Sequence, residues 1–330
     1  MENKEIIKEL KQITKIKSIN LPSSIIFSIV ENVLKVNLKD VSGNMQEDKS
    51  AFEGWIICLK SWFPEIEKVE LHWEQPYFKK DIEKYSEKEI KKDKNRELHY
   101  NRFLFRVLQF SKMYPWFSYS EGKKKNISDF ENILKNKLII NYPNDIKRHS
   151  ISESKKEDII ESLFVNEYKF LLKDKLLLSE LNQQLPVGIF TGLKSENTRL
   201  FTGQKSAIDI WGSNGDELSI FELKYQNKKV GIISELLFYL GIMNKVFIKG
   251  TIKYPEKARD IKYRDFPKLY SKIKTINKLK GYFLVDKDKL HPLIGNDVIK
   301  LINTGLENIG NISVDKLEYQ YNSINKELSW

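Results

Sequence analysis

The sequence predicts a mixed α/β protein built from two units, residues 1–150 and residues 151–330. Segments with the two-residue apolar alternation of strands are interspersed with segments of helical periodicity. The chain has 330 residues, more than one domain usually holds, and 41% of them are hydrophobic, which is enough for a sizeable core. Polar residues cluster at 144–155, and we expect the boundary between the two units there.

The first unit combines strands and helices without a pattern that specifies chemistry. Apolar alternation and helical spacing predict strands at 33–39, 67–74 and 137–142, and helices at 50–62 and 96–113. The lysine-rich residues 79–95 fit an exposed helix or a linker, and residues 121–127 fit a loop. The unit holds 19 of the 39 aromatic residues. They indicate a packed core or, alternatively, a surface that selects a substrate or partner.

The second unit has a more specific order of elements. The same patterns predict a helix at 155–173, strands at 185–190, 205–211 and 217–225, a helix at 230–248 and a strand at 281–285. A further helix at 297–308 and a strand at 313–321 follow. The first six elements therefore run α-β-β-β-α-β.

Charge and cysteine content limit the classes of function. The net charge is +11, with a pI of about 9.2, which favours an anionic partner such as nucleic acid. The single cysteine, Cys58, excludes an internal disulfide and a multi-cysteine zinc site, and its apolar neighbours predict a buried thiol. The N-terminus lacks the apolar core of a signal peptide, and the uncharged apolar stretch at 21–30 is too short to span a bilayer. We expect a soluble cytoplasmic protein that does not bind a membrane.

The strands at 205–211 and 217–225 are joined through Asn214-Gly215, a strong hairpin signal because both residues tolerate positive φ. A turn centred on these two residues sets Asp209 opposite Ile220. Because side chains alternate between the faces of a strand, Asp209, Glu222 and Lys224 then share one face. The apolar residues Ile208, Ile210, Phe221 and Leu223 take the other face.

Charged side chains within apolar strands need compensation, since a desolvated carboxylate is costly unless it is paired or bound to a cation. Two carboxylates on one face offer the hard oxygen ligands that Mg²⁺ or Mn²⁺ prefer. A lysine two residues after the second acid can orient a water beside the metal for attack on a phosphodiester. The alternative is an ion pair between Lys224 and the two acids, without a metal.

Asp209 and Glu222-Leu223-Lys224, with twelve residues between them, resemble the D…(D/E)-x-K signature of the PD-(D/E)XK nuclease superfamily. The predicted order of elements resembles the restriction-endonuclease-like core of that superfamily over roughly residues 155–290. Ile208 stands where the signature has proline. The resemblance implies that Asp209, Glu222 and the carbonyl group of Leu223 bind Mg²⁺ or Mn²⁺, and that Lys224 assists the attacking water.

The resemblance also implies an acid from the preceding helix. Glu167 lies on the predicted apolar face of a helix over 155–173, where a charge is costly unless it is used, and it is the preferred candidate. Glu161, nearer the edge of that face, is the second candidate, and Glu180 is a weaker third. An ordinary surface glutamate is the alternative.

Further candidates follow the strand pair. Glu235 and Tyr239 are four residues apart on a predicted helix, so they share a face that could approach the metal. Their spacing is similar to the Gln-x-x-x-Tyr of one exonuclease branch, with glutamate replacing glutamine. Lys228 and Lys229 could reach a phosphate of a nucleic acid, and a solvated turn is the alternative.

Basic residues elsewhere are candidates for phosphate contacts. Arg102 and Arg106 are one helical turn apart, with Arg96 nearby. Residues 251–280 contain ten basic against three acidic side chains, interleaved with aromatic residues, which fits a nucleic-acid surface or an ordinary solvated connector. No nucleotide-binding P-loop, serine-hydrolase elbow or paired metal-ligand histidines occur in the sequence.

These observations predict a Mg²⁺-dependent deoxyribonuclease that binds DNA and acts in restriction, phage defence or repair. The alternatives are an inactive nuclease-like protein that binds nucleic acid, and a subunit of a defence complex. A homodimer or a defence-system partner would be compatible with either.

Overall fold

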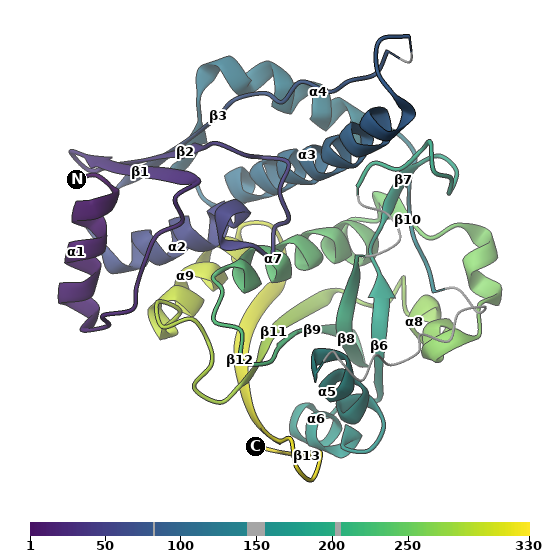
Figure 1. Ribbon diagram of the computed structural model, residues 1–330. Helices are drawn as coiled ribbons and strands as arrows, with labels where there is room; N and C mark the ends of the chain where they lie inside the picture. The colour runs from purple at the N-terminus through teal and green to yellow at the C-terminus, as the bar shows by residue number, and fades with distance from the viewer. Residues whose placement is uncertain (82, 144–155, 202–205) are drawn as a thin grey trace.

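The backbone combines three sheets with helices packed between and around them (Figure 1). In this computed structural model, residues 1–81, 83–143, 156–201 and 206–330 are described. The predicted α/β class is confirmed. The domain boundary expected at 144–155 lies outside the described residues, so the division into two units stays a prediction.

The first half forms a four-stranded sheet in the order β1-β2-β3-β4, in which β1 and β2 are antiparallel and the other neighbours are parallel. Its elements are α1 (Asn3–Thr14), β1 (Ile25–Val30), β2 (Val33–Leu38), η1 (Asp48–Ser50), α2 (Phe52–Trp62), β3 (Lys68–Trp73), α3 (Glu87–Met113), β4 (Phe117–Tyr119), η2 (Glu121–Lys123), α4 (Lys124–Leu134) and β5 (Leu138–Ile140). The elements predicted at 33–39, 50–62, 67–74 and 137–142 are therefore confirmed.

Two predictions in this half change. The helix predicted at 96–113 begins earlier, at Glu87, where the side chain of Ser86 accepts a hydrogen bond from the N–H of Glu89 and caps the helix. The loop predicted at 121–127 is wrong, since η2 and the start of α4 occupy it. Buried Ile127 and Phe130, three residues apart, anchor α4 on the core despite its polar surroundings.

The second half forms a six-stranded mixed sheet in the order β13-β12-β11-β9-β8-β6. The strands β6, β8 and β9 are antiparallel neighbours, whereas β9, β11 and β12 run parallel. Its elements are α5 (Lys156–Val165), α6 (Lys169–Leu176), β6 (Glu180–Pro186), β7 (Ile189–Thr191), β8 (Ala207–Asn214), β9 (Glu217–Lys224), α7 (Gly231–Met243), the π-helical turn η3 (Asn244–Ile248), β10 (Ile252–Lys253), η4 (Glu256–Asp260), η5 (Tyr263–Asp265), α8 (Phe266–Ser271), β11 (Lys278–Asp286), α9 (Asn296–Glu307), β12 (Ile312–Asn322) and β13 (Glu327–Ser329).

Two predicted elements of this half are divided. The helix predicted at 155–173 is interrupted by a turn between α5 and α6. The strand predicted at 185–190 is split, because β6 ends at Pro186, which has no N–H to donate, and β7 pairs with β5 instead. With β10 on the other side of β5, this small sheet joins the two halves of the chain.

The hairpin between β8 and β9 turns one residue later than predicted. Asn214 pairs with Glu217, so Gly215 (φ 55°) and Asp216 form the loop. Continuing this register sets Asp209 opposite Glu222 instead of Ile220. The change is two residues along the partner strand, so the later turn does not by itself invert the predicted alternation.

The two halves share one hydrophobic core. Helix α7 lies between the large sheet and α2 in the centre of the molecule (Figure 1), and its Phe238 packs on Phe105 of α3 with ring centroids 5.8 Å apart. The stretch Gly231–Ile248 is long and apolar enough to cross a membrane, but 89% of it is buried inside the protein as a central helix. Cys58 is buried, as predicted. Helices α5 and α6 cover the opposite face of the sheet, over a smaller apolar cluster.

Candidate metal centre

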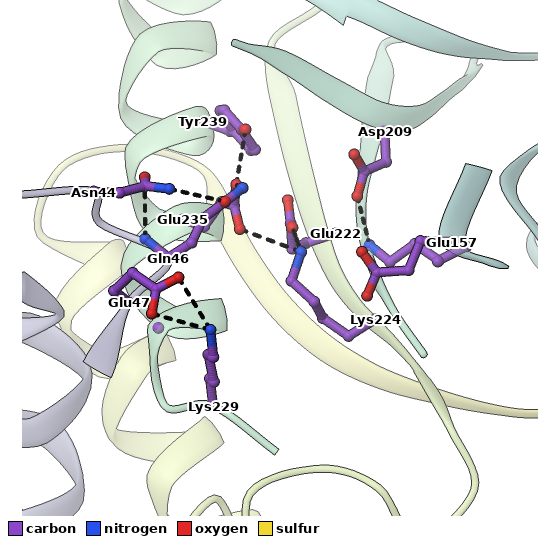
Figure 2. Close-up of polar contacts among 12 residues, drawn as sticks. Asn44, Gln46, Glu47, Glu157, Asp209, Glu222, Lys224, Lys229, Glu235 and Tyr239 are labelled. Carbon is purple, nitrogen blue, oxygen red and sulfur yellow. Dashed lines mark hydrogen bonds and ion pairs between the residues drawn. The ribbon is translucent and has the colours of Figure 1, made fainter. Parts of the chain in front are cut away.

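Glu222 and Lys224, the predicted acid and lysine of β9, meet Glu235 of α7 (Figure 2). Glu222 is 1% exposed and Lys224 is 9% exposed. The Nζ of Lys224 lies 2.5 Å from Oε1 of Glu222 and 3.3 Å from Oε2 of Glu235. Hence Lys224 links the strand to the central helix. The alternative without a metal expected Lys224 to pair with Glu222 and Asp209, but its second partner is Glu235 instead of Asp209.

Asp209 stands beside this group at the point where the β8–β9 ladder stops. The last paired residues are Ile210 and Phe221, and the carboxylate of Asp209 accepts a 3.0 Å hydrogen bond from the N–H of Leu223. Ile210, Phe221 and Leu223 belong to the apolar cluster under α5, as predicted. Ile208 was expected with them but joins the other cluster, on the α7 side.

Burial dominates the electrostatics of the acids. It raises the pKa of Asp209 to about 7, with Lys224 opposing this and Glu235 adding to it. Burial, then the charges of Asp209 and Glu235, raise the pKa of Glu222 well above its ordinary value. Although burial disfavours the ammonium form, Glu222 and Glu235 hold the pKa of Lys224 well above its usual range. One lysine therefore faces three carboxyl groups.

Helix α5 brings two more acids to Asp209. Glu161 is 6% exposed and accepts hydrogen bonds of 2.9 and 2.8 Å from the Nε2 of Gln184. Burial, followed by the charge of Asp209, raises the pKa of Glu161 to about 9. Glu157, one turn earlier, accepts a 3.1 Å hydrogen bond from the N–H of Tyr225, and no sequence signal distinguished it from an ordinary helix-terminal acid.

The preferred acid, Glu167, is exposed in the turn between α5 and α6. Its predicted place in the middle of an apolar helical face is wrong, because the helix is interrupted before it. Glu161, the second candidate, is the buried acid of α5 that lies beside Asp209. Glu180, the third candidate, lies in β6 and pairs with Lys268, with 3.0 Å between Oε2 and Nζ.

Glu235 and Tyr239 share a helical face, as predicted, and the Tyr239 hydroxyl donates a 3.1 Å hydrogen bond to Glu235. Gln46 of the first half donates its side-chain N–H to the same carboxylate (Figure 2). Sequence reasoning missed Gln46, since 189 residues separate it from Glu235 and no local pattern marks it.

The lysines and arginines predicted to contact phosphates differ in burial and in their ion-pair partners. Lys229 pairs with Glu47 at 3.1 Å, and Lys228 is exposed. Arg106 is buried in an ion pair with Glu53, so the expectation that it touches phosphates is wrong. Arg96 pairs with Asp93 at 2.8 Å from a position 41% exposed.

A cavity of about 790 Å³ opens between the halves beside Asp209. Both Asp209 and Glu235 reach its wall, as do the basic side chains of Arg102, Lys91 and Arg199. Its lining residues are Asn44, Met45, Gln46, Lys91, Asn95, Leu98, His99, Arg102, Gln184, Glu196, Arg199, Ser206, Ala207, Asp209, Glu235 and Tyr239. Neither Lys228 nor Lys229 belongs to this wall.

The donor set suits a hard divalent cation chemically. Oε2 of Glu222 is buried and receives no hydrogen bond from a described residue, and burial raises the pKa values of both Asp209 and Glu222. A divalent cation would stabilise the ionised form of such oxygens. Within the described ranges, however, no group of three or more His, Cys, Asp or Glu is arranged to hold a metal ion. Lys224 occupies one oxygen of Glu222 in this arrangement.

Comparison with known proteins identifies no relative. No protein-family description, no curated protein and no solved structure matches the chain.

Proposed function

We propose that this chain is a metal-dependent nuclease that hydrolyses DNA phosphodiester bonds with a PD-(D/E)XK-type centre. The observation that carries the proposal is that half-buried Asp209 and buried Glu222 and Lys224 lie together at the β8–β9 pair. The antiparallel β6-β8-β9 strands, the crossover through α7 and the parallel β11 support a restriction-endonuclease-like core. In that core, α5 would be the helix that supplies Glu161.

In this proposal, Asp209, Glu222 and the carbonyl group of Leu223 would hold Mg²⁺ or Mn²⁺, with Glu161 completing the oxygen ligands. The bound cation would supply Lewis-acid stabilisation of the negative charge that develops on the phosphate. For the cation to bind, Lys224 would move from Oε1 of Glu222 toward the cavity.

Lys224 would act as a cation instead of a general base, because the carboxylates around it keep its pKa high. An ammonium group donates hydrogen bonds, so it can orient a water and neutralise the phosphate during attack. Glu235, joined to Gln46 and Tyr239, would hold the ammonium group on the cavity side. Arg102, which lines the same cavity, would contribute positive charge toward a phosphate.

The second candidate is a nuclease-like protein that binds nucleic acid without cutting it, alone or as a subunit of a defence complex. The ion pair of Lys224 with Glu222 favours it, since this pair neutralises an acid that the enzyme would use for metal.

Cleavage assays distinguish these candidates. The purified protein would be incubated with plasmid DNA, linear DNA and RNA in Mg²⁺, Mn²⁺ or EDTA. We expect metal-dependent cleavage of DNA that disappears in Asp209→Asn and Lys224→Ala. The exposed controls Asp216→Asn and Lys35→Ala should retain full activity. A wild-type protein that binds DNA but cuts no substrate with either metal would favour the second candidate.

A further inference from the structure

A second concave surface lies outside the candidate metal centre and shares no lining residue with its cavity. It is a groove of about 1420 Å³ between the first half (α3, α4 and β5) and a wall formed by the loop after β7, η3, β10 and η4. We call it the lysine groove, because seven lysines line it: Lys112, Lys135, Lys137, Lys194, Lys245, Lys253 and Lys257. Among the described residues, two acids, Glu131 and Glu256, share this lining.

Most of this positive charge is not neutralised by the protein. Lys112 pairs with Glu131 at 2.9 Å, and among the described residues no ion pair joins the other six lysines to an acid. Burial and the nearby charge of Lys257 lower the pKa of Lys194. Folding therefore gathers like charges from five separate segments, which is unfavourable unless a polyanion occupies the groove.

The groove also offers surface for the flat parts of a ligand. Half-buried Leu134 and exposed Leu193 line it. Tyr254 also borders it, but its ring is buried against Phe247, Phe266 and Tyr270. A basic groove with exposed apolar side chains suits a single-stranded nucleic acid, because the lysines can meet the backbone charge and the leucines can contact the bases.

The lysine groove is connected to the candidate metal centre by two shared elements. Helix α3 contributes Arg102 to the cavity of the centre and Lys112 to the groove. At 1.5 Å per residue, these positions are about 15 Å apart along the helix. The segment after β7 likewise lines the groove with Lys194 and the cavity with Arg199, and Lys94 of α3 donates a 3.0 Å hydrogen bond to Asn197 of this segment.

We infer that the lysine groove binds the phosphate backbone of a single nucleic-acid strand that continues over the exposed segment 193–199 to the candidate metal centre. The inference deepens the proposed function and relies on it for the destination of the strand. Binding in the groove itself depends on the lysines alone. A volume above the range of about 300–1,000 Å³ that holds small ligands favours several nucleotides over one mononucleotide. The concave shape, walled on two sides, disfavours a flat membrane surface.

Binding would be measured by fluorescence anisotropy with a labelled single-stranded DNA of about 16 nucleotides. EDTA prevents cleavage, and NaCl is varied between about 50 and 200 mM. The test variant carries Lys137→Ala, Lys253→Ala and Lys257→Ala, all at exposed positions. The control variant removes the same charge on the far side of the molecule with Lys4→Ala, Lys8→Ala and Lys35→Ala, also exposed.

We expect the test variant to lose affinity at least about tenfold. Its binding should also depend less on salt: the slope of log K against log salt should be shallower by about 2, since each of the three lost phosphate contacts contributes about 0.7 on a single strand. The control variant should bind within about twofold of the wild type. Equal losses in both variants would show a net-charge effect and overturn the inference. So would displacement of the DNA by poly-glutamate as efficiently as by unlabelled DNA, because it would indicate an acidic protein partner.

The two proposals fail separately. If the wild type cuts nothing but the lysine groove variant loses binding, the groove stands and the nuclease proposal falls. If Asp209→Asn abolishes cleavage while the groove variant binds and cuts like the wild type, the groove inference falls alone. Melting temperatures of all variants would show that the exposed substitutions leave the fold intact.

Discussion

The carboxylate of Asp209 accepts a 3.0 Å hydrogen bond from the backbone N–H of Leu223, the middle residue of the Glu-Leu-Lys motif. This bond replaces the ladder between β8 and β9 where their pairing ends. Asp209, which we propose binds a metal, therefore also accepts a hydrogen bond that holds the two strands together. Substitutions at this position can affect metal binding and stability separately.

Asp209→Asn and Asp209→Ala should differ in stability. The asparagine oxygen can still accept the Leu223 N–H, whereas alanine leaves this donor without a partner. A buried unsatisfied donor costs about 1–3 kcal/mol, so the alanine variant should be less stable than the asparagine variant by that amount in urea unfolding. Equal stabilities would contradict a structural contribution from this bond.

The stability of the metal-free protein should fall as the pH rises. The pKa of Asp209 is raised from 3.8 to about 7, so the folded state holds a proton that the unfolded state has released within this range. Glu161, raised from 4.5 to about 9, extends the effect to higher pH. Each unit of pKa shift corresponds to about 1.4 kcal/mol.

Urea unfolding in EDTA from about pH 5 to about pH 9 measures this dependence. Asp209→Asn removes one of the two groups and should flatten the profile. Added Mn²⁺ should reduce the loss at high pH if the acids bind it. A wild-type profile as flat as that of Asp209→Asn would refute the raised pKa of Asp209.

Glu161→Gln and Glu167→Gln form a matched pair that tests which acid of the α5–α6 region serves the centre. Glu161 is buried beside Asp209, so we expect its substitution to reduce cleavage or Mn²⁺ affinity about 10- to 100-fold. Glu167 is exposed in the turn and should be neutral. Calorimetric titration with Mn²⁺ gives a readout independent of cleavage, and the reverse ranking would restore Glu167.

Arg106→Met should destabilise the protein strongly. It removes one partner of the buried ion pair with Glu53, whose carboxylate also accepts a 2.8 Å hydrogen bond from Ser234 of α7. Breaking a buried pair costs about 3–5 kcal/mol, because the remaining charge stays buried. Combining it with Glu53→Gln should recover part of this loss. A double variant less stable than Arg106→Met would argue against an uncompensated charge as the cause.

Local sequence pattern determined which residues could share the centre. Two-residue alternation and the Asn-Gly signal predicted that Asp209, Glu222 and Lys224 lie together, and they do, even though the turn lies one residue later at Gly215-Asp216. Parity survives because the register changes by an even number of residues. The same local periodicities predicted the α/β class and the burial of Cys58.

Only the tertiary structure decided which other side chains meet that face. The break between α5 and α6 exposes Glu167 and leaves Glu161 buried, and it depends on packing that a helical period does not encode. Gln46 reaches Glu235 from the other half of the chain, and lysines from separate segments converge on one groove. Such contacts join residues far apart in sequence, so they depend on how complete elements pack against one another, whereas alternation along a strand depends only on the neighbouring residues.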